Sequence, residues 1–282
     1  MISNQIKTFA LLVLLSGLIF MIGGLLGGRT GLILALILAL GMNFFSYFYS
    51  HKIVLAMYKA KNLPKKNAPE IHNMVERISK KAGIPKPKIY LIPSNNPNAF
   101  ATGRNPEHAV IAFTSGIAKI LTKKELEGVL AHEIGHVKNR DILISTIAAT
   151  LATVIMYIAS MARFAAIFGG SRDSNGNSNI VQILALSIVA PLAAMLIQFA
   201  ISRSREFIAD ETSARLTGEP KHLASALQKL EDNSRKLPMR MGNQSTASLF
   251  IINPFSGAKM AKLFSTHPLT KDRIDKLNSM KL

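Results

Sequence analysis

Four long apolar stretches constrain the fold of this chain more than any other feature. Residues 9–28 and 31–50 contain no charged side chain, and the stretches 142–168 and 180–202 are interrupted only by Arg163. Each has about the 20 residues that a helix needs to cross the hydrocarbon of a bilayer. One such stretch could be a buried helix of a soluble protein, but four together predict an integral membrane protein with four transmembrane helices.

The basic residues favour one orientation in that membrane. Of the 34 Lys and Arg residues, 16 lie in residues 51–142 and 14 in residues 203–282. Loops rich in Lys and Arg stay on the cytoplasmic side, so we expect a multi-pass protein of the cell (inner or plasma) membrane with both long segments in the cytoplasm. The net charge of +18 then reflects topology and contact with the lipid bilayer. No helix-turn-helix, RNP or zinc-finger pattern supports binding to nucleic acid.

The composition excludes several classes of protein. Apolar residues make up 49% of the chain, which is enough apolar surface to exclude a disordered or collagen-like chain. The chain contains no cysteine, which excludes disulfides, thiolate catalysis, iron–sulfur clusters and cysteine-bound zinc. Any metal site must therefore be built from His, Asp or Glu.

The apolar stretches divide the chain into four parts. Residues 1–50 and 142–202 each hold two predicted transmembrane helices, while residues 51–141 and 203–282 are two polar segments. The second polar segment is mostly helical in pattern.

The first polar segment follows the order helix, strands, helix. Helical spacing of apolar residues predicts a helix over 68–83, and short apolar runs predict strands over 87–93 and 109–114. Thr122 and Glu125 form a capping-box pattern in front of a further helix. The buried face of that helix is expected to carry Leu126, Val129 and Leu130.

This capped helix carries the motif His132-Glu133-Ile134-Gly135-His136. Residues four apart lie one turn apart on one face of a helix, so the two imidazoles can share one metal ion. Imidazole suits Zn²⁺, and Glu133 lies where it can accept a proton from a metal-bound water that attacks an amide. The alternative is an ordinary helix with two histidines on its polar face.

A third ligand is expected from the segment after the fourth apolar stretch. Glu206 and Asp210 are again four residues apart. This spacing lets Glu206 coordinate the metal while Asp210 accepts a hydrogen bond from the second nitrogen of a ligating histidine. The alternative is a surface where these carboxylates form salt bridges. Arg203, Arg205 and Arg273 are candidate partners for such carboxylates, and the sequence does not pair them.

Several motifs together resemble the HtpX family of membrane zinc metalloproteases, which are relatives of the prenyl-protein CAAX proteases. They are HEIGH at 132–136, REFIAD at 205–210, NAFATG at 98–103, and Thr266-His267-Pro268 followed by Arg273. The resemblance covers essentially the whole chain. It implies a mainly α integral membrane protein, with four transmembrane helices and a cytoplasmic α+β thermolysin-like metalloprotease domain.

The resemblance also assigns roles to residues. It implies that His132, His136 and Glu206 bind one Zn²⁺ per chain and that Glu133 is the catalytic base. Asn98-Ala99-Phe100 resembles the edge strand that binds the substrate backbone in thermolysin-like proteases, a mode of pairing that needs no particular sequence. His267 would lie near the active site, where it either stabilises the oxyanion or serves as a structural cap.

The function expected is that of a membrane-anchored zinc endopeptidase. His136 and Glu206 lie within about 10 Å, measured along their helices, of the predicted membrane boundary. Membrane proteins or misfolded proteins are therefore the expected substrates, and protein quality control is the setting that the resemblance implies. A non-enzymatic adaptor of the same fold would be expected to lose one of the motif residues. A transporter or channel would need more polar residues in its membrane helices.

Overall fold

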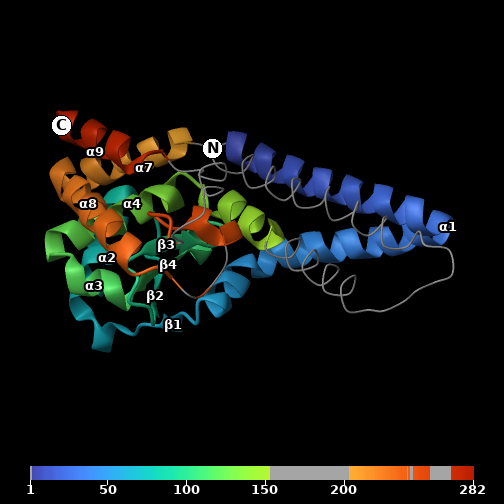
Figure 1. Ribbon diagram of the computed structural model, residues 1–282, viewed down its shortest axis with the longest axis horizontal. Helices are drawn as coiled ribbons and strands as arrows, with labels where there is room; N and C mark the ends of the chain where they lie inside the picture. Colours follow the sequence, from blue (N-terminus) through green and yellow to red (C-terminus); the bar gives the residue numbers. More distant parts are fainter. Residues whose placement is uncertain (1, 153–202, 240, 242–243, 255–267) are drawn as a thin grey trace.

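The computed structural model describes residues 2–152, 203–239, 241, 244–254 and 268–282 (Figure 1). Its helices are α1 (Ile2–Met57), α2 (Pro69–Ala82), α3 (Ser115–Ile120), α4 (Lys123–Lys138), α7 (Arg203–Thr217), α8 (Pro220–Lys236) and α9 (Thr270–Ser279). Short 3-10 turns are η1 (Lys65–Asn67), η2 (Pro106–His108) and η3 (Gln244–Leu249). The strands are β1 (Lys61–Asn62), β2 (Lys88–Ile92), β3 (Ala99–Thr102) and β4 (Val110–Thr114).

Helix α1 is a hairpin of two helical arms that project from the rest of the protein (Figure 1). The arms meet at Gly28, whose φ of 51° and ψ of −133° break the helix at a conformation that glycine adopts without a Cβ penalty. The Asn43 side chain donates a hydrogen bond of 2.9 Å to Ser16 Oγ across the arms. The break lies at the end of the first predicted apolar stretch, 9–28, just before the second, 31–50.

The second arm, Gly28–Met57, is long and apolar enough to cross a membrane. The other apolar helices in the described part of the chain, Ile6–Met21 and Ile142–Ala152, are shorter. The predicted span 142–168 is described only over its first residues, and the predicted span 180–202 lies wholly outside the described residues. Four transmembrane helices therefore stay a prediction.

The sheet has the order β1-β2-β4-β3, so β3 forms one of its edges. Strands β2 and β4 pair in parallel, with Ile89 opposite Ile111, and the edge strands β1 and β3 run antiparallel to their neighbours. The strands that the sequence predicts over 87–93 and 109–114 correspond to β2 and β4. Apart from Thr114, their buried residues are apolar on both faces, as expected for a pair covered on both sides.

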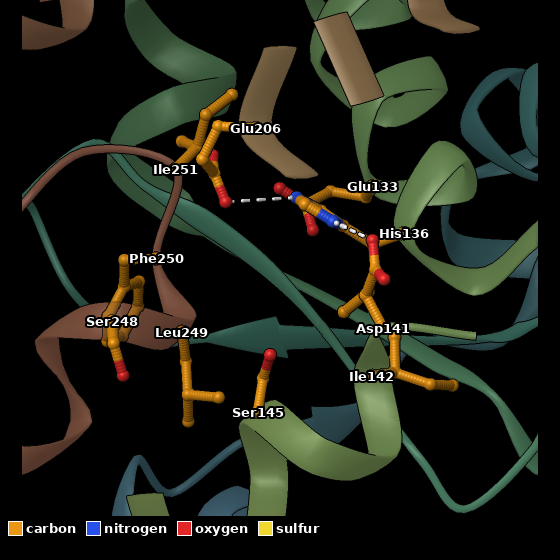
Figure 2. Close-up of a pocket in the computed structure, with 11 residues that line it drawn as sticks. Glu133, His136, Asp141, Ile142, Ser145, Glu206, Ser248, Leu249, Phe250 and Ile251 are labelled. Atoms are coloured by element: carbon orange, nitrogen blue, oxygen red, sulfur yellow. Dashed lines mark hydrogen bonds and ion pairs between the residues drawn. The ribbon is translucent and has the colours of Figure 1, made fainter. Parts of the chain in front are cut away.

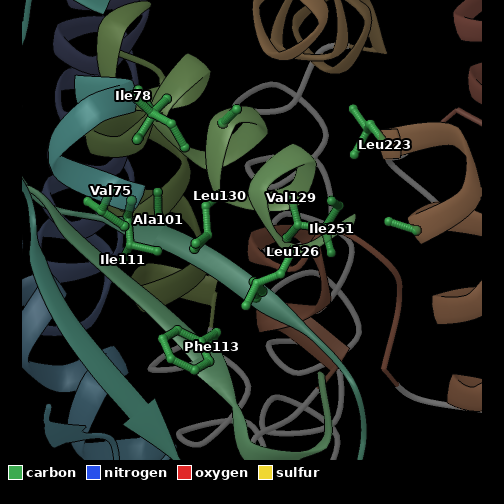
Figure 3. Close-up of a cluster of buried hydrophobic side chains, with 14 of the residues drawn as sticks. Val75, Ile78, Ala101, Ile111, Phe113, Leu126, Val129, Leu130, Leu223 and Ile251 are labelled. Carbon is green, nitrogen blue, oxygen red and sulfur yellow. The ribbon is translucent and has the colours of Figure 1, made fainter. Parts of the chain in front are cut away.

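Helix α4 lies at the centre of the domain, between the sheet and helices α7 and α8 (Figures 1 and 3). The three residues predicted for its buried face are all buried, and they belong to one hydrophobic core with side chains from α2 and β4. At Gly135 a Cβ would lie only 3.2 Å from Thr212 Cβ and 3.3 Å from Ala209 Cα. The absence of a side chain at Gly135 therefore lets α7 approach the metal-motif face of α4 closely.

The predicted capping box at the start of α4 is confirmed. Thr122 Oγ1 accepts from the Glu125 N–H, and the Glu125 carboxylate accepts from the Thr122 N–H at 2.8 Å. The same carboxylate accepts from Ser225 Oγ at 2.6 Å and from Lys229 Nζ at 2.8 Å, both on α8. Burial alone would raise the pKa of Glu125, but these donors outweigh it and lower the pKa to about 2. Glu125 thus ties α4 to α8.

We expect Glu125→Gln to lower the free energy of unfolding by about 2 kcal/mol at neutral pH, because a carboxylate with a depressed pKa stabilises the folded state. This contribution is present above the ordinary pKa of 4.5 and is lost as the pH falls from there towards about 2. Thermal unfolding followed by circular dichroism at pH 7 and pH 3 measures the effect. Glu127→Gln, which removes a solvent-exposed pairing with Arg77, is the matched control. Equal unfolding temperatures for both variants at pH 7 would contradict the prediction.

Candidate metal centre

Five acidic and imidazole side chains meet where α4 packs against α7. His132, Glu133 and His136 come from α4, and Glu206 and Asp210 come from α7. All are buried except His136, which is partly exposed. Helical periodicity aligns each set along its own helix, and the close approach at Gly135 brings the two sets together.

Three of these side chains direct their ligand atoms at one point. The Nε2 atoms of His132 and His136 lie 3.1 Å apart. The carboxylate of Glu206 lies 3.7 Å from the first of these nitrogens and 3.6 Å from the second. Figure 2 shows Glu206 facing His136 across this point. One ligand atom from each of the three residues lies within 4.8 Å of the others.

The other nitrogen of each imidazole faces a carboxylate. His132 Nδ1 lies 2.9 Å from Asp210 Oδ1, and His136 Nδ1 lies 3.2 Å from Asp141 Oδ2. A proton on each Nδ1 satisfies these contacts and leaves a lone pair on each Nε2. Two lone pairs only 3.1 Å apart repel each other unless a cation lies between them.

The donor set fits a zinc ion. A tetrahedral ion with bonds of about 2.1 Å separates its donor atoms by about 3.4 Å, close to the three distances in the structure. Three protein ligands of the types His, His and Glu leave a fourth position for water or substrate. His132, His136 and Glu206 would therefore hold the ion.

Glu133 lies beside this point and has a different environment. Its side chain is almost fully buried, and burial raises the pKa of its carboxyl to about 7 although the charge of His136 opposes the shift. The Ala101 N–H donates a hydrogen bond to it. A carboxyl group that titrates near neutral pH suits a residue that accepts and then releases a proton.

The charges around the point also favour a cation. Burial would lower the pKa of His136, but Glu206, Asp141 and Glu133 outweigh burial and raise it to about 9. Burial lowers the pKa of His132 to about 4, despite the hydrogen bond with Asp210. A carboxylate-rich pocket that holds one imidazole protonated when no metal is bound exchanges that proton for a metal ion.

Arg273 supports the site from α9. Its guanidinium is buried and donates to both Asp210 oxygens, at 2.9 and 2.7 Å, and to the Ile251 carbonyl at 3.0 Å. Burial would raise the pKa of Asp210, but Arg273 holds it below its usual range. The sequence left the partner of Arg273 open, and the structure pairs it with Asp210. Arg205 is buried, and the charges of Asp141 and Glu206 act on it.

The edge strand β3 lies next to Glu133, but part of its outer edge is already paired. Asn98 Nδ2 donates to the Ile252 carbonyl at 2.6 Å, and the Ala99 carbonyl accepts from the Ile251 N–H at 3.1 Å. Phe100 packs against the rings of Tyr58 and Phe250, which also contact each other. The predicted substrate-binding stretch Asn98-Ala99-Phe100 is thus largely engaged by the chain itself, and its substrate role stays a prediction.

A pocket opens between the metal-motif residues and the end of η3 with the two residues that follow it (Figure 2). Its polar lining residues are Glu133, His136, Asp141, Ser145, Glu206 and Ser248. Its apolar lining residues are Ala101, Ile142, Leu249, Phe250 and Ile251. The predicted site residue His267 lies outside the described residues.

Asp141 is the site residue that the sequence analysis missed. It lies just beyond α4, where Arg140 adopts a positive φ of 57° and the Asp141 N–H bonds back to the His136 carbonyl at 3.0 Å. This turn brings the carboxylate back to His136. The available signal in the sequence was a carboxylate five residues after His136. Helical spacing does not bring residues five apart onto the same face, so it did not predict a contact between Asp141 and His136.

We expect Asp141→Asn to weaken zinc binding by about 10–100-fold, because loss of the carboxylate removes the group that orients His136 and raises its basicity. Competition against a chelator of known affinity measures the effect. Asp232→Asn, an exposed carboxylate on α8, is the control and should bind zinc normally. Equal affinities for the two variants would show that Asp141 has no such role.

The chain is similar in sequence to known proteins of one family. The model of peptidase family M48 matches residues 65–281. A Protease HtpX homolog of Thermodesulfovibrio yellowstonii is 54% identical over 98% of both chains. One of Desulforapulum autotrophicum is 53% identical over 97% of this chain and 89% of its own, and one of Pyrococcus furiosus is 51% identical over 98% and 95%.

The fold is also similar to a solved structure. The crystal structure of S. mikatae Ste24p superposes with a TM-score of 0.55 at 20% identity, covering 98% of this chain and 66% of that one. At this identity the likeness concerns the fold alone. The family match and the near full-length relatives confirm the resemblance indicated by the sequence motifs: the chain belongs to peptidase family M48, and its relatives are named as HtpX homologs.

Proposed function

We propose that the protein is a membrane-anchored, zinc-dependent endopeptidase. One observation carries the proposal: the ligand atoms of His132, His136 and Glu206 converge on one point, beside a buried Glu133 whose pKa is raised to about 7. The membership in peptidase family M48 supports a metallopeptidase. That the metal is zinc, and that the enzyme cleaves bonds within a polypeptide, are the further parts of the proposal.

The residues of the chain divide the chemistry among them. A bound zinc ion would lower the pKa of a water molecule and polarise the carbonyl of the scissile peptide bond. Glu133 accepts the proton of the attacking water and delivers it to the departing amine. Asp210 and Asp141 hold the two imidazoles, and Arg273 keeps Asp210 ionised. His267 remains a candidate for stabilising the oxyanion.

The free part of the β3 edge is the proposed substrate-binding strand. The Asn98 carbonyl bonds to the Thr114 N–H of β4, so Ala99 and Ala101, at alternate positions, direct their backbone groups away from β4. The Ala99 carbonyl already accepts a hydrogen bond from the Ile251 N–H. The Ala101 N–H donates to Glu133, so an extended substrate would pair with the Ala101 carbonyl and with backbone groups beyond it. Such pairing accepts many sequences, which suits the degradation of misfolded proteins.

A direct test uses the purified full-length protein in detergent. We expect it to cleave casein, to lose this activity on treatment with a chelator and to regain it with zinc. An activity that survives full removal of metal would exclude a metal-dependent peptidase.

The proposed setting is the cell membrane, with the active site on the cytoplasmic side. The apolar arm Gly28–Met57 supports the anchor, and the abundance of Lys and Arg in both long segments supports the orientation. Segments of membrane proteins or unfolded proteins near the membrane surface are the proposed substrates, and quality control is the proposed role.

Reporter fusions test this topology. We expect reporters at Lys65 and Lys281 to score as cytoplasmic and one at Asn177 to score as outside, because an even number of spans separates the first two sites. A cytoplasmic score at Asn177 would mean that the stretches 142–168 and 180–202 do not both cross the membrane.

A further inference from the structure

The second arm of α1 enters the domain near the sheet (Figure 1). Basic residues lie at the end of this arm and on the elements next to it. They are His51 and Lys52 on α1, Lys88 at the start of β2, and Arg104 and His108 in the turn between β3 and β4. Lys88 lies beside the turn that carries His108, because its N–H donates to the Ala109 carbonyl at 3.0 Å. The charges of the other four residues also act on His51. We refer to these five residues as the basic cluster.

Direct contacts hold the basic cluster against the aromatic end of the arm. The Arg104 guanidinium lies over the Phe48 ring at 5.3 Å, and Lys52 Nζ lies over the Tyr49 ring at 4.9 Å. Arg104 Nη2 donates to His108 Nε2 at 2.8 Å. The turn after β3 is therefore fixed to α1 through Arg104, and the cations lie in a defined arrangement.

No carboxylate among the described residues forms an ion pair with Lys52, Lys88 or Arg104. The two lysines are exposed. Glu107 is the acidic residue of the same turn, and its exposed side chain forms no ion pair with them. The cluster thus presents three permanent positive charges that the described protein does not neutralise.

The position of the cluster along the arm indicates which anion would neutralise it. The charge-free residues 31–50 span about 30 Å as a helix, which matches the hydrocarbon thickness of a bilayer. Tyr47 and Tyr49 lie near the end of this span, where aromatic residues mark the membrane interface. His51 and Lys52 follow at once, at the depth of the lipid headgroups.

We propose that the basic cluster binds the headgroup of an anionic phospholipid. The proposal rests on the proposed membrane placement of the arm but not on the peptidase activity. Gly103 and Arg104 directly continue β3, so a bound headgroup would hold the end of the proposed substrate-binding strand at the membrane surface.

Native mass spectrometry of the full-length protein in a mild detergent tests the proposal. The probes are phosphatidylglycerol and phosphatidylcholine with the same acyl chains. We expect the protein to bind phosphatidylglycerol preferentially, and Lys52→Gln/Lys88→Gln to lose about tenfold or more in affinity for it, because each basic residue near the surface contributes to anionic lipid binding. Lys124→Gln/Lys221→Gln, which removes two exposed lysines at the starts of α4 and α8, should bind it like the unchanged protein.

A second pair of variants distinguishes a loss of lipid binding from a loss of folding. Arg104→Lys should keep most of the binding and Arg104→Gln should lose it, with circular dichroism confirming that both are folded. Equal phosphatidylglycerol binding by the two double-lysine variants would overturn the proposal. Displacement of the lipid by millimolar inorganic phosphate would assign the cluster to free phosphate and would also overturn it. Release of the protein from membranes by carbonate would instead show that the membrane placement is wrong.

Discussion

Replacing Glu133 by Gln is expected to leave the bound metal in place and to lower the rate of peptide cleavage by at least about 10²–10⁴-fold. Gln keeps the shape of the side chain but cannot accept the proton of the attacking water. Glu133 is buried, and this burial raises the pKa of its carboxyl to about 7. Rates of casein cleavage and the metal content of the same preparations measure the two effects together.

Glu127→Gln is the matched control for this variant, since Glu127 lies on the same helix and pairs with Arg77 at the surface. It should cleave casein at the normal rate. Near-normal cleavage by Glu133→Gln would exclude Glu133 as the base. Loss of metal from Glu133→Gln would instead make it a ligand, which its geometry does not indicate.

Replacing the two carboxylates of α7 is expected to have different effects on metal content and on stability. Glu206→Ala removes one of three ligands, and two histidines alone hold zinc poorly, so metal content and activity should both fall to near zero. Asp210→Asn keeps all three ligands but removes the carboxylate that accepts two short hydrogen bonds from the buried Arg273, whose ion pair with Glu206 is longer, at 3.7 Å. Breaking a buried ion pair costs about 3–5 kcal/mol, so this variant should unfold at a markedly lower temperature.

The contrast between the two variants is the test. Metal analysis should rank Glu206→Ala well below Asp210→Asn, for which we expect a loss of about 10–100-fold in zinc affinity. Thermal unfolding of the metal-free proteins should rank them in the opposite order. If Asp210→Asn loses its metal while Glu206→Ala retains it, the two carboxylates have exchanged roles. If neither variant loses metal, the third ligand lies elsewhere in the chain.

Local patterns in the sequence were sufficient to predict the helix that carries the motif. Thr122 and Glu125 specify its start through contacts three residues apart, and the spacing of His132 and His136 follows from helical geometry. The start of the helix and the spacing of its histidines depend on neighbours in sequence, which is why they can be predicted. The pairing of Glu206 with the histidines was inferred from its spacing to Asp210 together with the HEIGH motif, and from the family resemblance.

Other features of the site depend on tertiary contacts that no local pattern encodes. Arg273 reaches Asp210 from a helix 63 residues further along the chain. Ile251 pairs with Ala99 across 152 residues and so occupies part of the predicted substrate strand. Asp141 reaches His136 because Arg140 adopts an unusual positive φ. Each of these depends on how helices and turns pack, and the residue types alone do not specify it.

The order of the strands shows the same limit. The apolar runs at β2 and β4 predict strands but not that they pair in parallel while β3 turns back to the outer edge. This order is what places Ala101 beside Glu133.

Zinc titration of activity tests the central claim most directly. The full-length protein is stripped of metal, and casein cleavage is measured as zinc is added in steps below and above one equivalent per chain. We expect activity to rise in proportion to zinc and to reach its plateau at one ion per chain, with no activity regained by Glu206→Ala in the same range. Activity that does not depend on zinc, or that Glu206→Ala regains in parallel with the unchanged protein, would contradict the assignment of this site.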